Sequence, residues 1–393
     1  MKRIFLTTIA LFMLSAVSFA ESGTTGPLTW SLSNGTLTIS GTGAMPNYYS
    51  SDPPWYSYTS SITDVVIEYG VTSIGDRAFY ECSSLTSVTI GSSVTSIGYR
   101  AFSYCYSLTS VTIPNSVTSI GFGAFSGCSG LTSITIPESV TIIGTGAFSG
   151  CSKLTSVTIP ESVTSIGERA FVSCYALTDI EVSENNKAYA SENGILFNKS
   201  KSNLIKYPEG KQDASYTIPS SVTSIGEYAF CYCSGLALVT IPNSVTSIGE
   251  YAFAWCSALT SVTNLNPTPQ SINKWVFDYV DLSNVTLYVP AESVEDYKAA
   301  EIWEDFKEIK AYISSAIESS VTESDVSVYP NPVVESFRIS GITAPTEVII
   351  TDLSGRTLLQ QTVEAGESVA AGNLPKGVYL VRAGGKTLKV VKR

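Results

Sequence analysis

The sequence predicts a mostly β fold, a solenoid of stacked 23-residue coils, and two observations carry this prediction. The first is a row of five cysteines spaced 23 residues apart, at Cys82, Cys105, Cys128, Cys151 and Cys174. The second is the phrase around each of them, which reads VTSIGYRAFSYCYSLTSVTIPNS at 94–116 and returns around Cys233 and Cys256. Because one such unit cannot bury its own apolar face, neighbouring units must stack into a continuous core.

The coil at 94–116 illustrates how each unit is expected to fold. Its Val-Thr-Ser-Ile and Leu-Thr-Ser-Val-Thr-Ile segments are short and β-branched, so they predict two strands, ended by Gly98 and by Pro114. The Ala-Phe-x-x-Cys segment between them is predicted as a helical or 3₁₀ turn. A period of roughly 20–29 residues with a recurring Leu-x-x-Val-x-Ile is typical of a leucine-rich-repeat solenoid. The residues expected to face inward are Val94, Ile97, Ala101, Phe102, Cys105, Leu108, Val111 and Ile113.

The rest of the chain divides around this array. Lys2 and Arg3, a short apolar run and a small-x-small site ending at Ala20 predict a signal peptide. No later stretch reaches the roughly 18–20 apolar residues that a membrane span needs. The predicted segments are a signal peptide at 1–20, an N-terminal cap at 21–70, repeats at 71–265 with a hairpin insertion at about 183–214, a C-terminal cap at 266–312, a linker at 313–324 and a C-terminal domain at 325–393.

Both caps and the insertion have local signals. Asn34-Gly35 predicts a tight hairpin turn, since both positions of a type I′ turn need positive φ. Around it, Trp30, Trp55, Tyr48 and Tyr49 are expected to pack, although a ligand cage stays open. In the closing module, apolar residues of 291–310 recur at helical spacing and predict a capping helix. In the insertion, 195–198 and 203–207 predict two hairpin strands.

Composition excludes several classes of protein. The chain contains no histidine, which removes histidine bases, Ser-His-Asp nucleophiles and histidine metal ligands. Only 15% of residues are charged and the formal net charge is −11, so there is no basic footprint for nucleic acid. We therefore predict no catalytic residues, no metal and no cofactor, and a protein that is not an enzyme.

The cysteines invite a disulfide framework, because the chain is expected to leave the cytoplasm. Side chains at equivalent positions of stacked coils instead project in parallel, so neither disulfides nor a tetrahedral metal site suits them. We predict a ladder of reduced, buried thiols. Cys231 lies off this ladder, and exposure to solvent is one outcome for it. The predicted ladder consists of Cys82, Cys105, Cys128, Cys151, Cys174, Cys233 and Cys256.

Two faces are candidates for binding. One is the strand face with its rows of hydroxyls, although Thr is also simply a common exposed strand residue. The other is the variable set around Ala-Phe-x-x-Cys, where tyrosine, tryptophan and arginine are the types enriched at binding hot spots. Packing against the core is the open alternative for this set. The candidate ligand-binding residues are Arg77, Tyr80, Tyr99, Arg100, Tyr104, Tyr106, Tyr228, Tyr232, Tyr251 and Trp255.

The phrase I-P-x-S-V-T-S-I-G-x-x-A-F-x-x-C-x-x-L-T-x-V-T resembles the BspA-type leucine-rich repeats of bacterial surface proteins, over about 70–265. The segment VPAESVEDYKAAEIWEDF is similar to the one that commonly closes these arrays. The resemblance implies an adhesin that binds host extracellular matrix or plasma proteins, fibronectin- or fibrinogen-like, or other cells.

The C-terminal segment resembles the type A sorting domain of type IX secretion in Bacteroidetes. The match lies in VYPNP at 328–332, ITDLSGR at 350–356, LPKGVYLVRA at 374–383 and the basic end KTLKVVKR. From the residues alone, 325–393 reads as a small β-sandwich with eight Lys and Arg against six Asp and Glu. The resemblance implies that this domain engages the type IX secretion machinery, after Sec export to the periplasm, and that the product is secreted or attached to the outer membrane at the cell surface.

The sequence thus predicts an exported binding module, an adhesin without catalysis. A glycan-binding surface module and a structural spacer without a specific ligand stay open as alternatives.

Overall fold

The computed structural model describes residues 21–49, 53–312, 327–341, 345–352, 356–383 and 386–393. The chain forms two compact units, Met1–Tyr312 and Ile313–Arg393, and each is described here by itself. The predicted signal peptide and linker lie outside the described residues.

The N-terminal cap contains the expected hairpin. Strands β2 (Leu28–Ser33) and β3 (Thr36–Gly41) pair antiparallel around Asn34 and Gly35, whose φ values are 51° and 82°. The cap is completed by β1 (Glu21–Thr25), β4 (Gly43–Ala44) and the 3₁₀ turn η1 (Tyr56–Tyr58). Trp30, Tyr48 and Trp55 are buried together, with ring centres 5.7 to 6.1 Å apart, as predicted, whereas Tyr49 is exposed.

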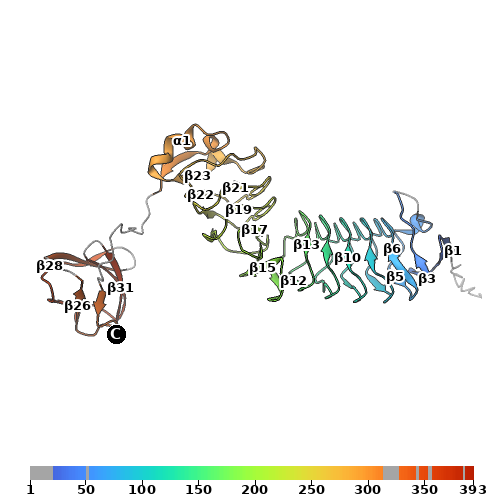
Figure 1. Cartoon of the computed structure of the whole chain (residues 1–393), viewed down its shortest axis with the longest axis horizontal. Helices are drawn as coiled ribbons and strands as arrows, with labels where there is room; N and C mark the ends of the chain where they lie inside the picture. The colour runs from blue at the N-terminus through green and yellow to red at the C-terminus, as the bar shows by residue number, and fades with distance from the viewer. Residues whose placement is uncertain (1–20, 50–52, 313–326, 342–344, 353–355, 384–385) are drawn as a thin grey trace, which may run out of the picture. The chain divides into compact units, whose positions relative to one another are not determined.

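The first run of coils builds two parallel ladders of short strands, which are visible side by side in Figure 1. On one face lie β5 (Asp64–Ile67), β7 (Ser87–Ile90), β9 (Ser110–Thr112), β12 (Ser156–Ile159) and β14 (Asp179–Val182). On the other lie β6 (Val71–Ile74), β8 (Ser96–Ile97), β10 (Ser119–Ile120), β11 (Ile142–Ile143) and β13 (Ser165–Ile166). The strands predicted from the repeat are confirmed.

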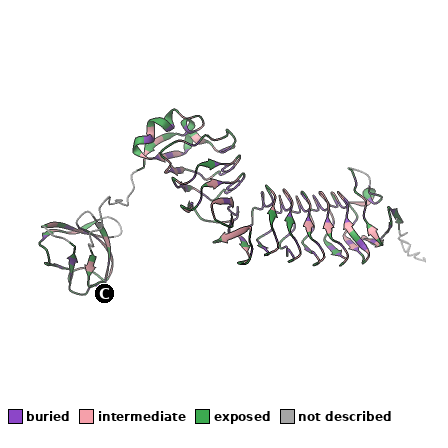
Figure 2. Cartoon of the chain, viewed as in Figure 1, coloured by how far each residue is buried: buried purple, intermediate pink, exposed green. Residues whose placement is uncertain are grey.

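The core runs along the inside of the coils, as the buried residues in Figure 2 show. All eight residues predicted to face inward at 94–116 are buried. One phenylalanine from each coil stacks on the next, with ring centres 5.1 to 5.8 Å apart from Phe79 to Phe171. Trp55 covers the first ring and Trp303 meets the last one, Phe277, so both ends of the unit are closed by aromatic side chains.

The Ala-Phe-x-x-Cys segment is not a helix or a 3₁₀ helix, which corrects the prediction. It is a chain of tight turns in which alternate N–H groups bond within the coil and to the following coil. The first kind join Ala101 to Gly98, Ser103 to Arg100 and Cys105 to Phe102; the second join Arg100 to Phe122, Phe102 to Ala124 and Tyr104 to Ser126. Because half of the donors serve the neighbouring coil, a helix cannot form.

The insertion holds the two predicted strands and one more. Strands β15 (Tyr189–Glu192), β16 (Ile195–Asn198) and β17 (Asn203–Lys206) form an antiparallel meander, and β17 then pairs parallel with β19 (Ser224–Ile225). The insertion therefore contributes a short coil to the stack.

The second run of coils continues from this point. It contains β18 (Ser215–Thr217), β20 (Leu238–Ile241), β21 (Ser247–Ile248), β22 (Ser261–Asn264) and β23 (Thr286–Val289). Its column of stacked rings runs through Tyr207, Phe230, Phe253 and Phe277.

The closing module is only briefly helical, against the prediction of one helix over 291–310. It consists of η2 (Leu282–Asn284), η3 (Ala291–Ser293), α1 (Val294–Lys298), η4 (Trp303–Asp305) and the strand β24 (Glu308–Ala311). Ile302 at φ 70° breaks the helical path, and β24 adds to β23 as a last parallel strand. Tyr297, Trp303 and Phe306 are nevertheless buried, so the module does cap the core.

The second unit is a two-sheet β domain, as predicted. One sheet joins β25 (Ser327–Tyr329), β26 (Ser336–Ser340) and β29 (Ser368–Ala370); the other joins β27 (Thr346–Thr351), β28 (Thr357–Val363), β30 (Gly377–Ala383) and β31 (Lys386–Lys392). Residues of both sheets share one apolar cluster that includes Phe337, Val348 and Val381.

Candidate binding surface

Two positions of each coil carry the variable large side chains. We call them the pre-Ala position, directly before the alanine of Ala-Phe-x-x-Cys, and the pre-Cys position, directly before its cysteine. In the coils that keep both the alanine and the cysteine, the two positions have a left-handed backbone, with φ between 49° and 77°, whichever residue occupies them. The residues there are Arg77 and Glu81, Arg100 and Tyr104, Gly123 and Gly127, Gly146 and Gly150, Arg169 and Ser173, Tyr228 and Tyr232, and Tyr251 and Trp255.

This conformation explains the glycines of the middle coils. A left-handed backbone costs an L-residue about 1–2 kcal/mol, a cost that glycine avoids. The early and late coils carry tyrosine, tryptophan and arginine at the same positions. These residues bear a backbone strain that glycine would avoid, so the fold itself does not require them. Strained residues of this kind commonly mark a functional surface.

The late coils turn these residues into two parallel rows of rings, which we call the late aromatic surface. In the pre-Ala row, Tyr228, Tyr251 and Trp275 stack with centres 4.9 and 6.0 Å apart. In the pre-Cys row, Tyr232, Trp255 and Tyr279 stack at 4.8 and 4.7 Å, and Tyr175 meets Tyr232 edge-on. Tyr175, Trp275 and Tyr279 are exposed, and Tyr279 is 74% accessible. Burial raises the pKa of Tyr228 and Tyr232, so their hydroxyls remain neutral.

Sequence reasoning found four members of this surface and missed three. Tyr228, Tyr232, Tyr251 and Trp255 were predicted, and the structure brings them together. Tyr175 follows its cysteine directly, and Trp275 and Tyr279 lie in a coil whose alanine and cysteine are replaced by Val276 and Val280. Aligning that coil on its Val-Phe pair would have revealed both residues.

The early coils form a second, smaller cluster, which we call the early aromatic surface. Tyr99 stacks on Phe122 at 5.2 Å, and the guanidinium groups of Arg77 and Arg100 lie 5.4 and 5.2 Å from the Tyr99 ring. Beside them, Tyr104 contacts Tyr80 and Tyr106. The six predicted residues are thus contiguous, and the exposed Phe122 joins them. Interleaved arginine and aromatic rings gain cation–π energy of about 0.5–1 kcal/mol at such exposed sites.

The hydroxyl rows of the strand face are exposed but partly used within the fold. Thr109, Ser110 and Thr112 point outward as expected. Thr86 and Thr132 donate their hydroxyl protons to the carbonyls of Thr63 and Thr109 in the preceding coil. These bonds give the threonines a structural role, so the strand face is the weaker candidate.

All eight cysteines are free and buried thiols. In six of the seven ladder coils the thiol donates to a carbonyl of the preceding coil at 3.1 to 3.8 Å, pairing Cys105 with Phe79, Cys128 with Phe102, Cys151 with Phe125, Cys174 with Phe148, Cys233 with Tyr207 and Cys256 with Phe230. Cys231 is fully buried among Val172, Tyr228 and Ala254, so of the outcomes open to it, exposure to solvent does not occur. It occupies the position of Ser103 and Ala254, which are also buried, whereas Ser126 and Ser149 at the same position are half-buried.

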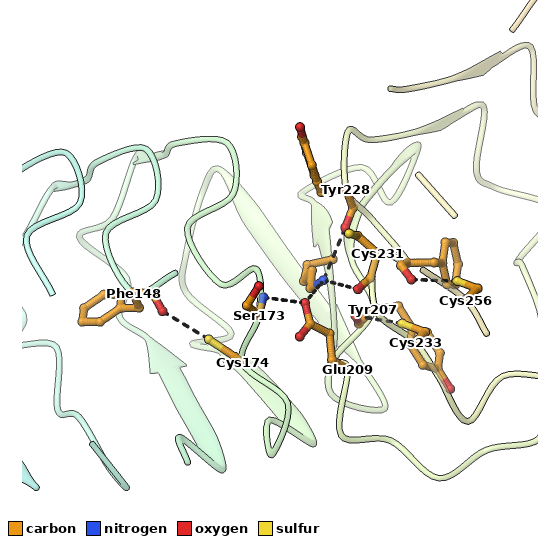
Figure 3. A network of polar contacts seen from close by, with 11 residues as sticks. Phe148, Ser173, Cys174, Tyr207, Glu209, Tyr228, Cys231, Cys233 and Cys256 are labelled. Atoms are coloured by element: carbon orange, nitrogen blue, oxygen red, sulfur yellow. Dashed lines mark hydrogen bonds and ion pairs between the residues drawn. The ribbon is translucent and has the colours of Figure 1, made fainter. Parts of the chain in front are cut away.

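The junction between the two runs of coils contains a buried ion pair. Lys206 Nζ lies 2.9 Å from Glu209 Oε1 and also donates to the carbonyls of Tyr228 and Cys231 at 3.3 Å. Glu209 in turn accepts the N–H of Ser173 at 2.9 Å, as Figure 3 shows. Desolvation, the largest single effect, lowers the pKa of Lys206, but the charge and hydrogen bond of Glu209 together with the nearby Cys233 and Cys231 outweigh it, so the pKa is raised. Burial raises the pKa of Glu209 despite the lysine.

The arrangement of these residues gives little support for a catalytic or metal-binding site. In the described part of the chain, no group of three or more Cys, Asp or Glu side chains is placed to hold a metal ion. The charged pair of the junction is engaged with the backbone on both sides. What the surface offers is contact: aromatic edges, hydroxyls and guanidinium groups on a rigid support.

Comparison with known proteins identifies the class of this molecule as a leucine-rich-repeat solenoid with an export domain. The model of the BspA type leucine rich repeat region matches six copies, over residues 53–178, 96–214 and 209–321, and the chain belongs to this family. The secretion system C-terminal sorting domain matches residues 327–393. The chain is therefore an exported protein of the cell surface or the medium. A search of curated proteins gave no match.

Two solved structures support the fold. A leucine-rich repeat protein from Eubacterium ventriosum is 30% identical, with 74% of this chain and 85% of that chain covered and a TM-score of 0.59. A leucine rich cell surface protein from Faecalibacterium prausnitzii is 28% identical, with 76% and 97% covered and a TM-score of 0.51. No enzyme family is indicated by these matches. Among the described residues, no helix has the length and hydropathy of a membrane span.

Proposed function

We propose that this protein is a surface-exposed or secreted adhesin that binds proteins of the host matrix or plasma, or of neighbouring cells, through its late and early aromatic surfaces. The observation that carries the proposal is the presence of aromatic and arginine residues at left-handed positions where the middle coils carry glycine. Their strain is unnecessary for stacking coils, and their residue types are those of protein-binding hot spots. The Sec route to the periplasm, passage through type IX secretion machinery and attachment to the outer membrane belong to the same proposal, supported by the sorting domain.

The stacking geometry favours a protein ligand over a glycan. Rings in the middle of the two rows, such as Tyr251 and Trp255, are covered on their faces by neighbours whose ring centres lie 4.7 to 6.0 Å away, and they present their edges. Aromatic edges with hydroxyl and indole N–H groups suit the mixed polar and apolar surface of a protein. A glycan is the second candidate because Tyr279, at the end of its row, is 74% exposed.

The test uses glycine as the replacement, since the middle coils show that the backbone accepts it. The double variants Y251G/W255G and R100G/Y104G each convert one aromatic surface to the pattern of a middle coil. We expect the full-length chain to bind at least one member of a panel containing fibronectin and fibrinogen, and at least one double variant to bind that protein at least about tenfold more weakly.

Asn34 supplies the matched control, because it has a left-handed backbone, carries no aromatic ring and lies in the cap hairpin outside both aromatic surfaces. N34G should bind like the unaltered chain. If the unaltered chain bound no protein of the panel while a glycan array gave a saturable signal, the glycan alternative would replace the adhesin. If both double variants bound normally, neither aromatic surface would be the site.

A further inference from the structure

The solenoid is interrupted between its two runs of coils. On one face of the solenoid, a ladder of parallel strands ends at β13, and the next ladder begins with the meander β15–β16–β17. On the other face, one ladder ends at β14 and the next begins at β18, and these two strands do not pair with each other. A cleft of about 530 Å³ lies at this interruption, within the size range of ligand sites. Its floor is apolar, with Ile166, Leu196 and Ile205, and Ile166 is half-buried where its counterparts in neighbouring coils are buried.

One wall of the cleft is a backbone edge prepared for another coil. In earlier coils the N–H groups equivalent to those of Arg169 and Phe171 donate to the following coil, and the carbonyls equivalent to those of Thr164 and Ile166 accept from it. In the described chain these two donors and two acceptors have no hydrogen-bond partner, and all four residues line the cleft. Unpaired edge groups of this kind are the template to which an extended peptide adds.

The other edge groups nearby are already satisfied by side chains. Tyr189 accepts the N–H of Ile166 with its hydroxyl at 2.8 Å, and Glu209 accepts the N–H of Ser173. Lys206 donates to the carbonyl of Cys231, whose counterpart Ser103 accepts an N–H from the preceding coil, and adds a second donor to the carbonyl of Tyr228. Side chains of the protein therefore satisfy the backbone N–H groups of Ile166 and Ser173, whereas the backbone groups beside Arg169 stay unpaired among the described residues.

The rim of the cleft is rich in acceptors. Glu168 and Glu227 both line the cleft, one in the coil before the interruption and one in the coil after it. Burial and the nearby Glu168 and Glu250 raise the pKa of Glu227, while Arg169 lowers it. The buried Oδ1 of Asn203 has no partner in the described chain. The one exposed cation of the rim, Arg169, is held 4.3 Å from the centre of the Tyr228 ring.

We propose that this cleft binds an extended segment of a partner protein, which pairs with the open carbonyls of Thr164 and Ile166 and the open N–H groups of Arg169 and Phe171 and places a lysine or arginine side chain against Glu168 and Glu227. The backbone edge supplies the affinity, and the two carboxylates with the Asn203 oxygen select a basic side chain, as suits a chain of net charge −11. This inference rests on the proposed function, because it assigns a peptide-binding subsite to the adhesin.

The test is selection of short linear peptides displayed on phage against the purified full-length chain. I166W serves as the counter-selection, because the larger side chain fills the cleft. We expect the enriched peptides to carry a basic residue, to bind E168Q/E227Q at least about tenfold more weakly, and to slow amide exchange at 164–171 when bound. E138Q is the control: Glu138 is an exposed carboxylate of an earlier coil that neither lines the cleft nor acts on Glu227, so its loss should leave affinity unchanged.

Peptides that bind I166W and E168Q/E227Q as well as the unaltered chain would overturn the inference, and so would a selection that recovers none blocked by I166W. E168Q/E227Q keeps the test valid if I166W fails to fold. Binding of the matrix and plasma panel is measured on the same variants. Panel binding that depends on the aromatic surfaces but not on the cleft would leave the adhesin in place and remove only the peptide site.

Discussion

Lys206 is the residue at which this chain departs most from its own repeat. Its neighbour Tyr207 takes the place of the coil phenylalanine, since its N–H bonds Ala229 and its carbonyl accepts the thiol of Cys233. Lys206 therefore stands where the other coils carry a buried alanine or, at Val276, a buried valine. A buried charge is tolerated only when it is paired and hydrogen-bonded, and Lys206 meets that condition through Glu209 and two carbonyls.

Replacing Lys206 by methionine should destabilise the first unit strongly. K206M leaves the carboxylate of Glu209 buried without its partner, and breaking such a pair costs about 3–5 kcal/mol. K206M/E209M should recover part of this loss, because no charge is then left unpaired. Urea denaturation followed by tryptophan fluorescence gives the free energies of unfolding.

Lys201 is the control for that prediction, because its ion pair with Glu192 is half-exposed and of similar length, 2.6 Å. K201M should cost no more than about 1 kcal/mol. Equal effects of K206M and K201M would contradict the view that the buried pair holds the junction together.

At the residue scale, the sequence predicted which side chains cluster better than it predicted their backbone. The ten candidate residues fall into two contiguous surfaces, and glycine at 123 and 127 is the signal that would have revealed left-handed backbone at Arg100 and Tyr104. The Lys206–Glu209 pair could not be found this way. Its register depends on a short coil whose sequence, NLIKYPEG, has lost the repeat phrase.

Among the elements, the cysteine ladder has an energetic consequence of its own. Burial raises the pKa of the Cys82, Cys231 and Cys256 thiols to about 12 and holds the pKa values of Cys105, Cys151 and Cys233 well above their ordinary value. In the unfolded chain these thiols ionise near pH 9. The folded state therefore binds more protons than the unfolded state above that pH.

Stability should accordingly fall as pH rises from 9 towards about 12, because ionisation then favours the unfolded chain. Each thiol that ionises only on unfolding contributes a slope of about 1.4 kcal/mol per pH unit. C151A should reduce the slope by one such contribution. The interval between pH 9 and 10 is the informative one, because tyrosines begin to ionise near pH 10. Chemical denaturation at several pH values measures the slope.

Thiol titration of the denatured, unreduced protein is the necessary control. The ladder of reduced thiols predicts that nearly all eight cysteines react. Two or fewer reactive thiols would show that disulfides form in the exported protein, and the alkaline loss of stability would then have another cause.

Element predictions succeeded where a period repeats and failed where a single copy had to be interpreted. The strands of the coils recur many times, and stacking gives each one a partner. The closing module occurs once, and its apolar spacing fits a helix as well as the helix–turn–strand path that is present. The strand β24 is favoured by the open edge of β23, a tertiary partner that periodicity does not report.

For the whole molecule, the two units have separate cores. The first unit is closed by aromatic caps at both ends, and the second has its own apolar cluster around Phe337. The repeat period was sufficient to predict the solenoid of the first unit. The motifs at 328–332 and 374–383 were sufficient to predict the sorting domain of the second unit. The cleft does not follow from those patterns, and neither does the contact of Tyr175 with Tyr232, because both depend on how the short coil at 203–214 joins the stacks.

Removing residues 313–393 should separate export from binding. Because the first unit carries its own caps and core, a chain ending at Tyr312 should keep its thermal unfolding transition and its affinity for whichever panel protein the full chain binds. The same chain lacks the sorting domain, so in the native bacterium we expect it to accumulate inside the cell envelope and to be absent from the surface and the medium. Surface labelling and fractionation of the culture measure its location.

Y251G/W255G is the matched control, since it keeps the sorting domain and should be exported normally while binding weakly. Appearance of the truncated chain outside the cell at the level of the full chain would contradict the role assigned to the second unit.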